Sequence, residues 1–396
     1  VGVSANAKAT LAATAENIKP ALASITALLG TTRKLETVKL DELMHALERW
    51  PTAPPILVES ATEARVIPNH ELWVPANATG GGGNALVFAG EAAISSAILQ
   101  LTQKDKTAVV FTYFGGPAPL TPDFSNVQRM QELPRAPYQA LGDMLRQENF
   151  ETAEWDVSQV KTPPEVEGAT RRVYVIFAPQ PPPRPNPMQP SPQAGMTPAD
   201  RDIVLNAVRE SGMALFLAGW RPSPTPFPEP WEYNDYLRTD WGLEVDDTAL
   251  AWQFMPDQSK SDVWRLMSRD PILTTDGGLE FGDHPIGKAL RSQRTALYAV
   301  TPLKVLEGDA RPAGVTVGTV ARVPATDDVW AITELARMQD IFTGRQRECR
   351  PADSDIRAPF PVAVAAENEK QQRVVVIGSE AFAVDQIAMI SIGQAI

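Results

Sequence analysis

Four short apolar runs, rich in β-branched and aromatic residues, most constrain what this chain can fold into. They are TAVVFTY (Thr107 to Tyr113), RVYVIF (Arg172 to Phe177), MALFLA (Met213 to Ala218) and RVVVIGS (Arg373 to Ser379). Glycine or proline closes each run, and a helical pattern adjoins each. Such runs are typical of strands buried on both faces of a parallel sheet. The sequence therefore predicts an open α/β sheet, in which functional groups lie in loops at the carboxyl ends of the strands.

The segments around these runs extend the same pattern. Tyr138 to Asn149 has an amphipathic helical pattern, and Phe150 to Val157 alternates like a strand. Thr197 is a suitable N-cap for a helix over 198–210, with proline at its first position. Pro361 to Ala366 lies one polar turn before the last run, which indicates an antiparallel pair. We expect an α/β fold with a layered, mostly parallel sheet flanked by helices.

Two proline-rich stretches interrupt this order, at 179–197 and 221–230. We interpret both as exposed insertions, because a helical or strand pattern resumes directly after each. Residues 1–85 are expected to form a smaller helical and α/β region, and residues 86–396 the main α/β domain. Further short helices are expected over 90–101, 231–239, 285–290, 328–338 and 380–396.

The charge and the few reactive side chains narrow the function. The net charge is −12 and the pI about 4.9, which argues against nucleic acid and anionic lipid as partners. The single cysteine, Cys349, cannot form an intramolecular disulfide, and we expect its thiol to face solvent in a charged loop. The three histidines are too widely spaced to suggest a metal cluster, and no cofactor is expected.

The ends of the chain suggest an excised piece of a longer protein. No run of about 18 apolar residues is present, so we expect no membrane span within the chain. It opens VGVSANAK without an initiator methionine or signal peptide, and it stops inside an apolar helical pattern.

Candidate ligand-binding residues follow three of the predicted strands. Trp220 and Arg221 combine an aromatic plane with a forked donor, which suits a sugar or a carboxylate, and also suits packing under the second proline-rich stretch. Ser379 and Glu380 suit the N-cap and first turn of the last helix, and Glu380 is also a candidate general acid or base. With Tyr113, these residues are expected to border one crevice, but they do not make a nucleophile, base and orienting group.

Two glycine-rich loops do not carry nucleotide-binding motifs. Gly80 to Gly83 has no following lysine and hydroxyl pair, and Thr112 to Pro117 has only two adjacent glycines where a dinucleotide loop needs three at set spacing. We interpret Gly115-Gly116 as a turn that lets the chain leave the sheet.

The order of several segments resembles a known family. They are NALVFAGEAAISSAILQLTQKDKTAVVFTYFGGP from Asn84, the helix from Tyr138, RVYVIFAP, MTPADRDIVLNAVRESG, MALFLAG, the turn at Asp283 to Ile286, and RVVVIGSEAF. Over about 84–396 they resemble GldG-type auxiliary components of ABC-2-type transporters. The loop at Phe114 to Pro117 departs from that family in lacking a histidine and an acid, and Ser379-Glu380 replaces its late Asp-Ser-type turn.

The resemblance implies a flavodoxin-like or amidotransferase-like core and a periplasmic domain on the outer face of the bacterial inner membrane. It further implies a membrane tether outside this chain, a permease and an ATPase as partners, and service to an exporter or to gliding motility. We expect a non-catalytic binding or scaffold domain with a glycan or peptide ligand. The alternative is a carbohydrate-binding or hydrolytic enzyme of amidotransferase-like fold.

Overall fold

The computed structural model divides into two compact units, residues 1–104 and 105–396. The boundary thus follows the helix that starts at Gly90, whereas the sequence had placed it before that helix, at 85/86. Several predicted features lie outside the described residues. They are the whole second proline-rich stretch with Arg221, most of the first, the first 55 residues, and all but the start of the predicted last helix. The structure describes 56–60, 64–67, 72–75, 86–88, 90–102, 106–122, 136–166, 168–177, 196–220, 231–260, 263–291, 295–345 and 348–381.

The described residues of the first unit form two small antiparallel strand pairs and the helix α4. Strand β1 (Ile56–Glu59) pairs with β2 (Ala64–Ile67), and β3 (Trp73–Pro75) pairs with β4 (Leu86–Phe88). Helix α4 (Gly90–Thr102) confirms the helix expected at 90–101. A small buried cluster of Ile67, Leu72 and Ala97 joins β2 and α4 to the residue that precedes β3.

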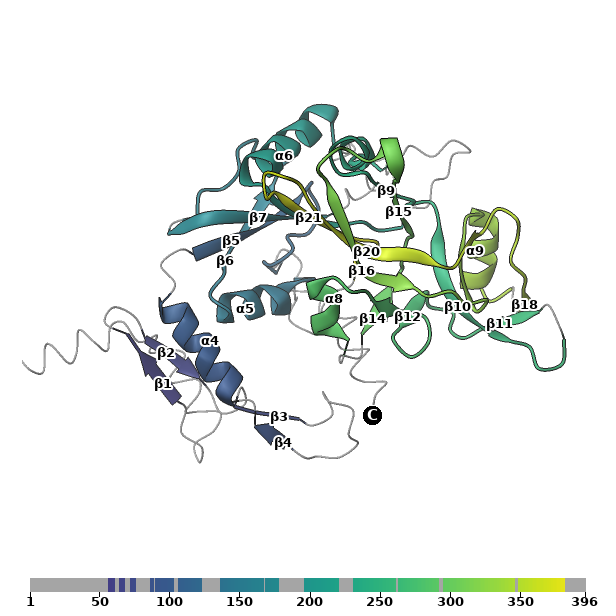
Figure 1. The fold of residues 1–396 in the computed structure, drawn as a ribbon, viewed down its shortest axis with the longest axis horizontal. Helices are drawn as coiled ribbons and strands as arrows, with labels where there is room; N and C mark the ends of the chain where they lie inside the picture. Colours follow the sequence, from purple (N-terminus) through teal and green to yellow (C-terminus); the bar gives the residue numbers. More distant parts are fainter. Residues whose placement is uncertain are drawn as a thin grey trace, which may run out of the picture. The chain divides into compact units, whose positions relative to one another are not determined.

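The second unit is built on an eight-stranded sheet, whose parallel part confirms the four predicted strands (Figure 1). The parallel strands are, in spatial order, β21 (Arg373–Ile377), β8 (Met213–Leu217), β7 (Ala169–Phe177), β5 (Lys106–Tyr113) and β6 (Glu151–Asp156). The β6 strand confirms the prediction over 150–157. All five carboxyl ends therefore lie at the same edge of the sheet.

The rest of this sheet is antiparallel, so the fold is α/β with a large mixed sheet. Strand β20 (Phe360–Glu367) pairs antiparallel with β21, which confirms the predicted hairpin. Beyond it lie β16 (Thr316–Val323) and the short β13 (Glu280–Phe281), both antiparallel to their neighbours. The sequence predicts a mostly parallel sheet because β16 and β13, the two strands beyond β20, come from segments without a clear strand pattern.

Helices cover both faces of the parallel strands, which explains the apolar runs in β5, β7, β8 and β21, whereas the edge strand β6 alternates with polar residues. Helix α6 (Pro198–Ser211) packs on the face that carries Val110, and α5 (Gln139–Gln147) packs on the face that carries Phe111 (Figure 1). Adjacent residues of one strand point to opposite faces, so an apolar run satisfies both cores. Burying one such side chain stabilises the fold by about 1.5–3 kcal/mol.

Helix α6 begins as the sequence predicted. The Thr197 hydroxyl accepts a hydrogen bond from the Asp200 amide at 3.2 Å, and the Asp200 carboxylate accepts one from the Thr197 amide at 3.2 Å. This reciprocal cap satisfies donors that have no partner inside the helix. The helix ends at Gly212, whose φ of 72° is left-handed. Glycine suits that conformation because it has no Cβ to clash.

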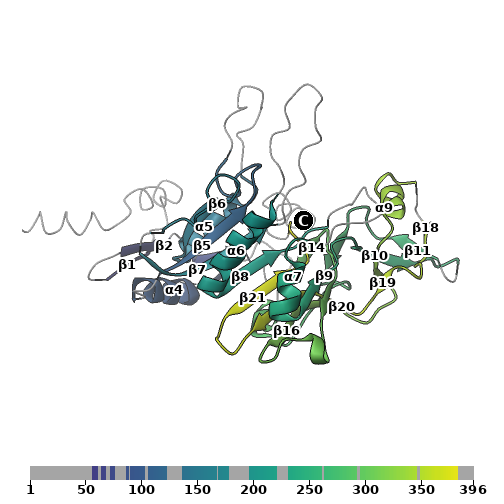
Figure 2. The ribbon, with the colours of Figure 1, turned by 90° about the horizontal axis from the view of Figure 1, so that it is seen from above.

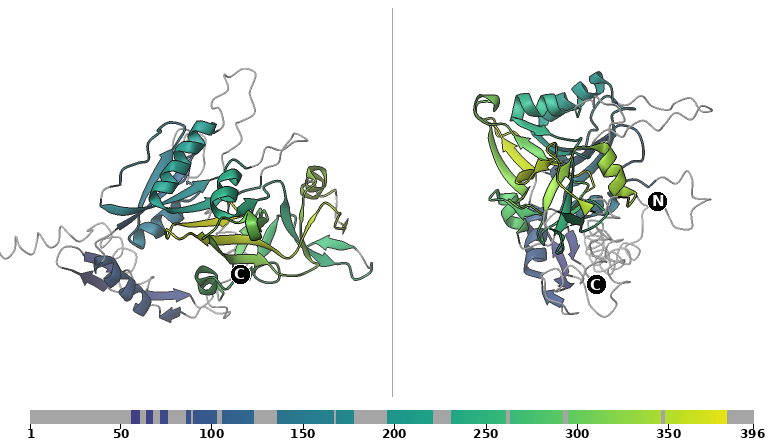
Figure 3. Two further views of the ribbon diagram at one scale, coloured as in Figure 1. Left: turned by 45° about the horizontal axis from the view of Figure 1, so that its top comes forward. Right: turned by 90° about the vertical axis from the view of Figure 1, so that its right-hand side faces the viewer.

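A second, antiparallel sheet lies at one end of this unit (Figure 2, Figure 3). Its order is β18 (Glu348–Cys349), β11 (Trp264–Leu266), β10 (Leu250–Pro256), β17 (Val329–Ile332) and β19 (Ile356–Arg357). The prediction of a helix over 328–338 is wrong for the first part of this range. Its first half is β17, a fully buried VWAI run that pairs with β10, and only its second half joins helix α9 (Leu335–Phe342).

The core of the antiparallel sheet is aromatic and also contains the cysteine. The rings of Phe254 and Trp330 stack with their centroids 3.6 Å apart, and Trp264 meets Trp330 edge-on at 5.7 Å. The expectation of a solvent-facing Cys349 is wrong, because the residue pairs with Trp264 across β18 and β11 and is fully buried. Burial raises the pKa of its thiol to about 11, with Asp355 also raising it against an opposing effect of Arg337.

The two remaining helix predictions had different outcomes. Helix α8 (Pro285–Leu290) is confirmed, with the His284 ring nitrogen Nδ1 accepting from the Ile286 amide at 3.3 Å. The helix predicted over 231–239 is instead a short α turn, α7 (Asn234–Tyr236), followed by a π-helix, η3 (Leu237–Trp241). The buried Asn234 amide exchanges two hydrogen bonds with the Val245 backbone, at 2.9 and 2.8 Å, which fixes this turn against the following strand. In the part of the chain that is described, no helix is long and apolar enough to span a bilayer.

Candidate functional site

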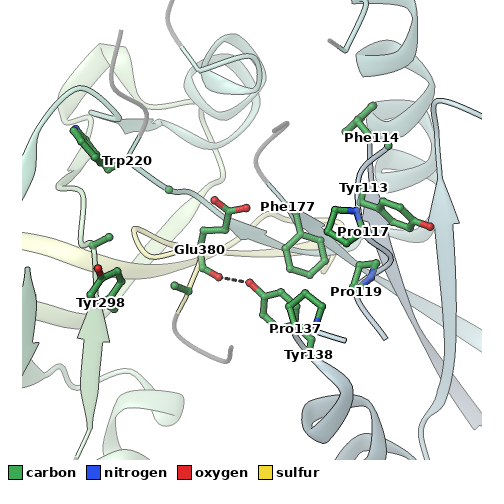
Figure 4. A pocket seen from close by; sticks show the side chains of 14 residues that line it. Tyr113, Phe114, Pro117, Pro119, Pro137, Tyr138, Phe177, Trp220, Tyr298 and Glu380 are labelled. Atoms are coloured by element: carbon green, nitrogen blue, oxygen red, sulfur yellow. Dashed lines mark hydrogen bonds between the residues drawn. The ribbon is translucent and has the colours of Figure 1, made fainter. Parts of the chain in front are cut away.

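A cavity of about 320 Å³ opens where the parallel strands β5, β7 and β8 end (Figure 4). This is the edge at which open α/β sheets hold their ligands. Its walls come from the ends of those strands, from the residues before α5, from the end of β14 (Ala296–Tyr298) and from the segment after β21. The described lining is dominated by rings, which are Tyr113, Phe114, Tyr138, Phe177, Trp220, Tyr298, Pro117, Pro119 and Pro137.

Carboxylates of the edge strand β6 hold the loop that follows β5. Asp156 accepts a hydrogen bond from the Gly115 amide at 3.0 Å, and Glu154 accepts one from the Leu120 amide at 2.6 Å. Gly115 and Gly116 have φ values of 65° and 79°, which confirms the predicted turn out of the sheet. The loop therefore has a fixed path, and the two of its prolines that line the cavity, Pro117 and Pro119, are part of a fixed wall.

Tyr138 ties three segments together beside the cavity. Its hydroxyl donates to the Glu380 carbonyl oxygen at 2.5 Å, and its amide donates to the Pro119 carbonyl oxygen at 2.9 Å. Its ring packs on that of Phe177, with centroids 4.7 Å apart. The start of α5, the loop after β5 and the segment after β21 are thus joined at one buried side chain.

Glu380 lies directly over Gly219, at the end of β8. A Cβ atom at position 219 would come within 2.7 Å of the Glu380 Oε2 atom and 3.0 Å of its Cβ atom. A side chain at position 219 would therefore require Glu380 to shift. Figure 4 shows the carboxylate directed into the space between Trp220 on one side and Phe177 and Pro117 on the other.

The tyrosines of the cavity are held in the neutral form. Burial, with smaller contributions from Asp156 and Glu154, raises the pKa of Tyr113 to about 12. Burial also raises the pKa of Tyr138, with help from Glu380, and the pKa of Tyr298. These phenols stay protonated at neutral pH, so they offer ring faces and hydroxyl groups rather than charge.

Three of the five predicted site residues line this cavity. They are Tyr113, Trp220 and Glu380, and Figure 4 shows the Tyr113 hydroxyl pointing away from Glu380. Ser379 does not line it, because this fully buried residue donates its hydroxyl to the Tyr298 carbonyl oxygen at 2.6 Å and so holds the wall in place. Arg221 is not among the described residues. A ligand-binding role for the three lining residues stays a prediction.

Sequence reasoning missed several residues of the wall. Phe177 ends its apolar run just as Tyr113 does, and that position at a strand end was a usable signal. The amphipathic pattern that begins at Tyr138 predicts a helix there but does not bring this residue to the strand ends. Tyr298 lies in a stretch without clear periodicity, and nothing in the local sequence brings it to this site. The prolines at 117, 119 and 137 were not considered as a surface.

The chemistry that this site offers is apolar contact with a few polar groups. Among the lining residues that the structure describes, Glu380 is the one carboxylate. Across the described ranges, no three His, Cys, Asp or Glu side chains gather into a group that could hold a metal ion. Aromatic and proline rings contact flat apolar ligand surfaces, and the phenols and the carboxylate orient them.

Comparison with known proteins adds distant likenesses. No protein-family model matches the chain, and no curated protein matches its sequence. The mmIFT52 N-terminal domain aligns with a TM-score of 0.35 at 10% identity, covering 73% of this chain and 96% of that domain. The exo-β-1,4-mannosidase Op5Man5 from Opitutaceae bacterium strain TAV5 aligns with a TM-score of 0.30 at 8% identity, covering 79% of this chain and 38% of that enzyme. Likenesses this distant assign neither a family nor a function.

Proposed function

We propose that the second unit is a non-catalytic binding domain whose ligand occupies the cavity where β5, β7 and β8 end. The observation that carries this proposal is the ring-lined wall itself. The loop after β5 is held by the carboxylates of Asp156 and Glu154. The segment after β21 is held by the hydrogen bond from the Tyr138 hydroxyl to the Glu380 carbonyl oxygen. A wall fixed before the ligand arrives loses little conformational entropy when it binds.

The proposal extends to the setting in which the domain acts. The order of segments over 84–396 resembles GldG-type auxiliary components, and α5 and α6 cover opposite faces of the parallel strands, which fits a flavodoxin-like or amidotransferase-like layering. In this proposal the domain lies at the periplasmic face of the inner membrane, is tethered outside this chain, and serves a permease and an ATPase of ABC-2 type.

Copurification tests this setting. The full-length protein, affinity-tagged in its own cells and extracted with a mild detergent, is expected to bring down an ABC-2-type permease and its ATPase, identified by mass spectrometry. The matched control is the same tag on a version without residues 105–396. Recovery of neither subunit, or equal recovery with the control, contradicts the proposal.

One observation favours the alternative, an enzyme or lectin that acts on carbohydrate. The Glu380 carboxylate points into an aromatic-lined cavity, and sugars are bound by aromatic faces and carboxylates. Purified protein should then hydrolyse nitrophenyl glycosides or esters, and Glu380→Gln should abolish the activity. Activity that survives in Glu380→Gln would show that this cavity is not the active site.

A further inference from the structure

An exposed aromatic ring continues the apolar wall beyond the cavity. Trp220 lines the cavity, and its ring centroid lies 5.9 Å from that of Phe342 on helix α9. Phe342 is 40% exposed and is not itself part of the cavity lining. A ligand longer than the cavity can therefore leave it along Trp220 and stay in apolar contact with Phe342.

A guanidinium group lies at the far end of this ring pair. Arg269 Nη2 would be 2.9 Å from a Cβ atom at Gly344, two residues after Phe342. Along the chain from Arg269, the Pro271 carbonyl oxygen accepts a hydrogen bond at 2.8 Å from the amide of Ala299, which lines the cavity. Arg269 is thus held between the end of α9 and the cavity wall.

The side chain of Arg269 is available to a ligand. It is exposed, and its guanidinium makes no ion pair or hydrogen bond with any of the residues that the structure describes. The adjacent Asp270 forms no ion pair with it, and acts instead on Tyr298, whose pKa is raised by burial and further by this carboxylate. A cation is favourable over the C-terminal end of α9 in any case, so a role in binding needs a readout that this structural role does not change.

The path from the cavity to Arg269 suits an apolar body with an anionic end. The described cavity lining is dominated by rings, and Phe342 extends it towards the guanidinium. A guanidinium pairs with a carboxylate through two parallel hydrogen bonds. The net charge of −12 disfavours anions in general, so an unpaired guanidinium beside apolar rings makes this one path selective.

An alkyl chain fits this path better than a sugar or a peptide. Sugars and peptide backbones carry several hydrogen-bonding groups, and each one buried without a partner costs binding free energy. In the described wall, the Tyr138 hydroxyl already donates to a backbone carbonyl oxygen, and the Tyr113 hydroxyl points away from Trp220 (Figure 4). An alkyl chain has no such groups, and a cavity of about 320 Å³, at the lower end of ligand pockets, suits a single chain of medium length.

We propose that the ligand of this cavity is a medium-chain alkyl carboxylate. Its chain fills the cavity and lies along Trp220 and Phe342, and its carboxylate pairs with Arg269. This inference rests on the proposed function, since it names the ligand class of the same binding domain.

Isothermal titration calorimetry with the full chain tests the inference. The probes are decanoate and decanol, which share a chain but differ in charge, and hexanoate, which has a shorter chain. A Leu-Leu-Leu peptide and cellobiose represent peptides and sugars. The variants are Arg269→Gln and Phe342→Ala. Arg322→Gln is the charge-matched control, because Arg322 is exposed, pairs with Glu280 and does not line the cavity.

The expected result is a specific pattern of losses. Arg269→Gln weakens decanoate about threefold or more, as for an exposed ion pair, and leaves decanol unchanged. A purely structural effect at the end of α9 would weaken both ligands equally. Phe342→Ala weakens both about fivefold, as for an apolar contact at the edge of a site, and its urea midpoint is measured alongside. Hexanoate binds more weakly than decanoate by up to about fourfold for each missing methylene, and Arg322→Gln changes neither ligand.

Four outcomes overturn the inference. They are no binding of decanoate, equal binding of hexanoate and decanoate, equal effects of Arg269→Gln on decanoate and decanol, and binding of the peptide or of cellobiose without decanoate. None of these outcomes affects the proposed partnership with a permease and an ATPase, which copurification decides separately. Failure of the copurification would overturn that partnership, whatever the alkyl ligands do.

Discussion

The ion pair between Arg337 and Asp355 is expected to stabilise the antiparallel sheet more than any exposed pair. Arg337 Nη1 lies 2.7 Å from Asp355 Oδ1, and the two side chains are 16% and 0% exposed. Asp355 also accepts from the Ala352 amide at 2.8 Å, and Arg337 donates to the Arg350 carbonyl oxygen at 2.9 Å. Arg337→Met keeps most of the apolar stem but leaves a fully buried carboxylate without its partner.

The cost of Arg337→Met follows from this burial. Removing one member of a buried pair typically costs about 3–5 kcal/mol, because the remaining charge is left uncompensated. With an m-value of about 3 kcal/mol/M, the urea midpoint would fall by about 1 M or more. The control is Arg345→Met, which removes an ion pair to Asp340 at 3.3 Å whose side chains are 70% and 46% exposed. Such pairs contribute about 0–1 kcal/mol.

Urea unfolding followed by tryptophan fluorescence measures both variants. The double variant Arg337→Met/Asp355→Asn should lose less than the sum of the two single variants, because it leaves no unpaired carboxylate. If Arg337→Met costs no more than Arg345→Met, the reasoning from burial is refuted.

The Arg337→Met variant is also expected to disturb the cavity wall. Helix α9 carries both Arg337 and Phe342, and the Phe342 ring lies 5.9 Å from that of Trp220.

Three further predictions follow from single contacts. Burial raises the pKa of the Cys349 thiol to about 11, so this thiol should not react with a disulfide reagent at neutral pH until the protein is unfolded. Because the pKa is higher in the folded state, the stability that the protonated thiol contributes is complete below the unfolded-state pKa and is lost as pH rises through about 11. Gly378→Ala would place a Cβ atom against the Thr301 carbonyl oxygen, and should lower the free energy of unfolding by about 1–3 kcal/mol in urea titrations. Burial alone would raise the pKa of Asp200, but hydrogen bonds from Lys161 and the helix cap lower it below its usual value. The stability that the Asp200 carboxylate contributes is therefore present above the unfolded-state pKa and is lost as pH falls through the folded-state pKa. The melting temperature of Asp200→Asn should consequently fall less at acid pH than that of the wild type. An equal fall in both proteins would contradict this.

Local chemistry was sufficient to predict the parallel strands and several helix ends. A seven-residue apolar run closed by glycines, such as that from Thr107 to Tyr113, favours a strand covered on both faces, and the cap at Thr197 depends on residues three positions apart. The run from Val329 to Ile332 is equally apolar, yet it was assigned to a helix, because four residues do not distinguish a strand from a helical turn. Its partner β10 decides the matter, and that pairing joins residues distant in sequence.

The sequence by itself determined an α/β chain with functional loops at the carboxyl ends of its parallel strands, because side-chain periodicity and helix caps act over a few residues. Only the tertiary structure decided which groups meet there. Tyr298 reaches the cavity from β14, and the carboxylate of Glu380 lies over Gly219 because that position has no side chain. The burial of Cys349 has the same origin, since it depends on strands that pair across long stretches of chain. Contacts of this kind are set by packing between distant segments, and no local pattern encodes them.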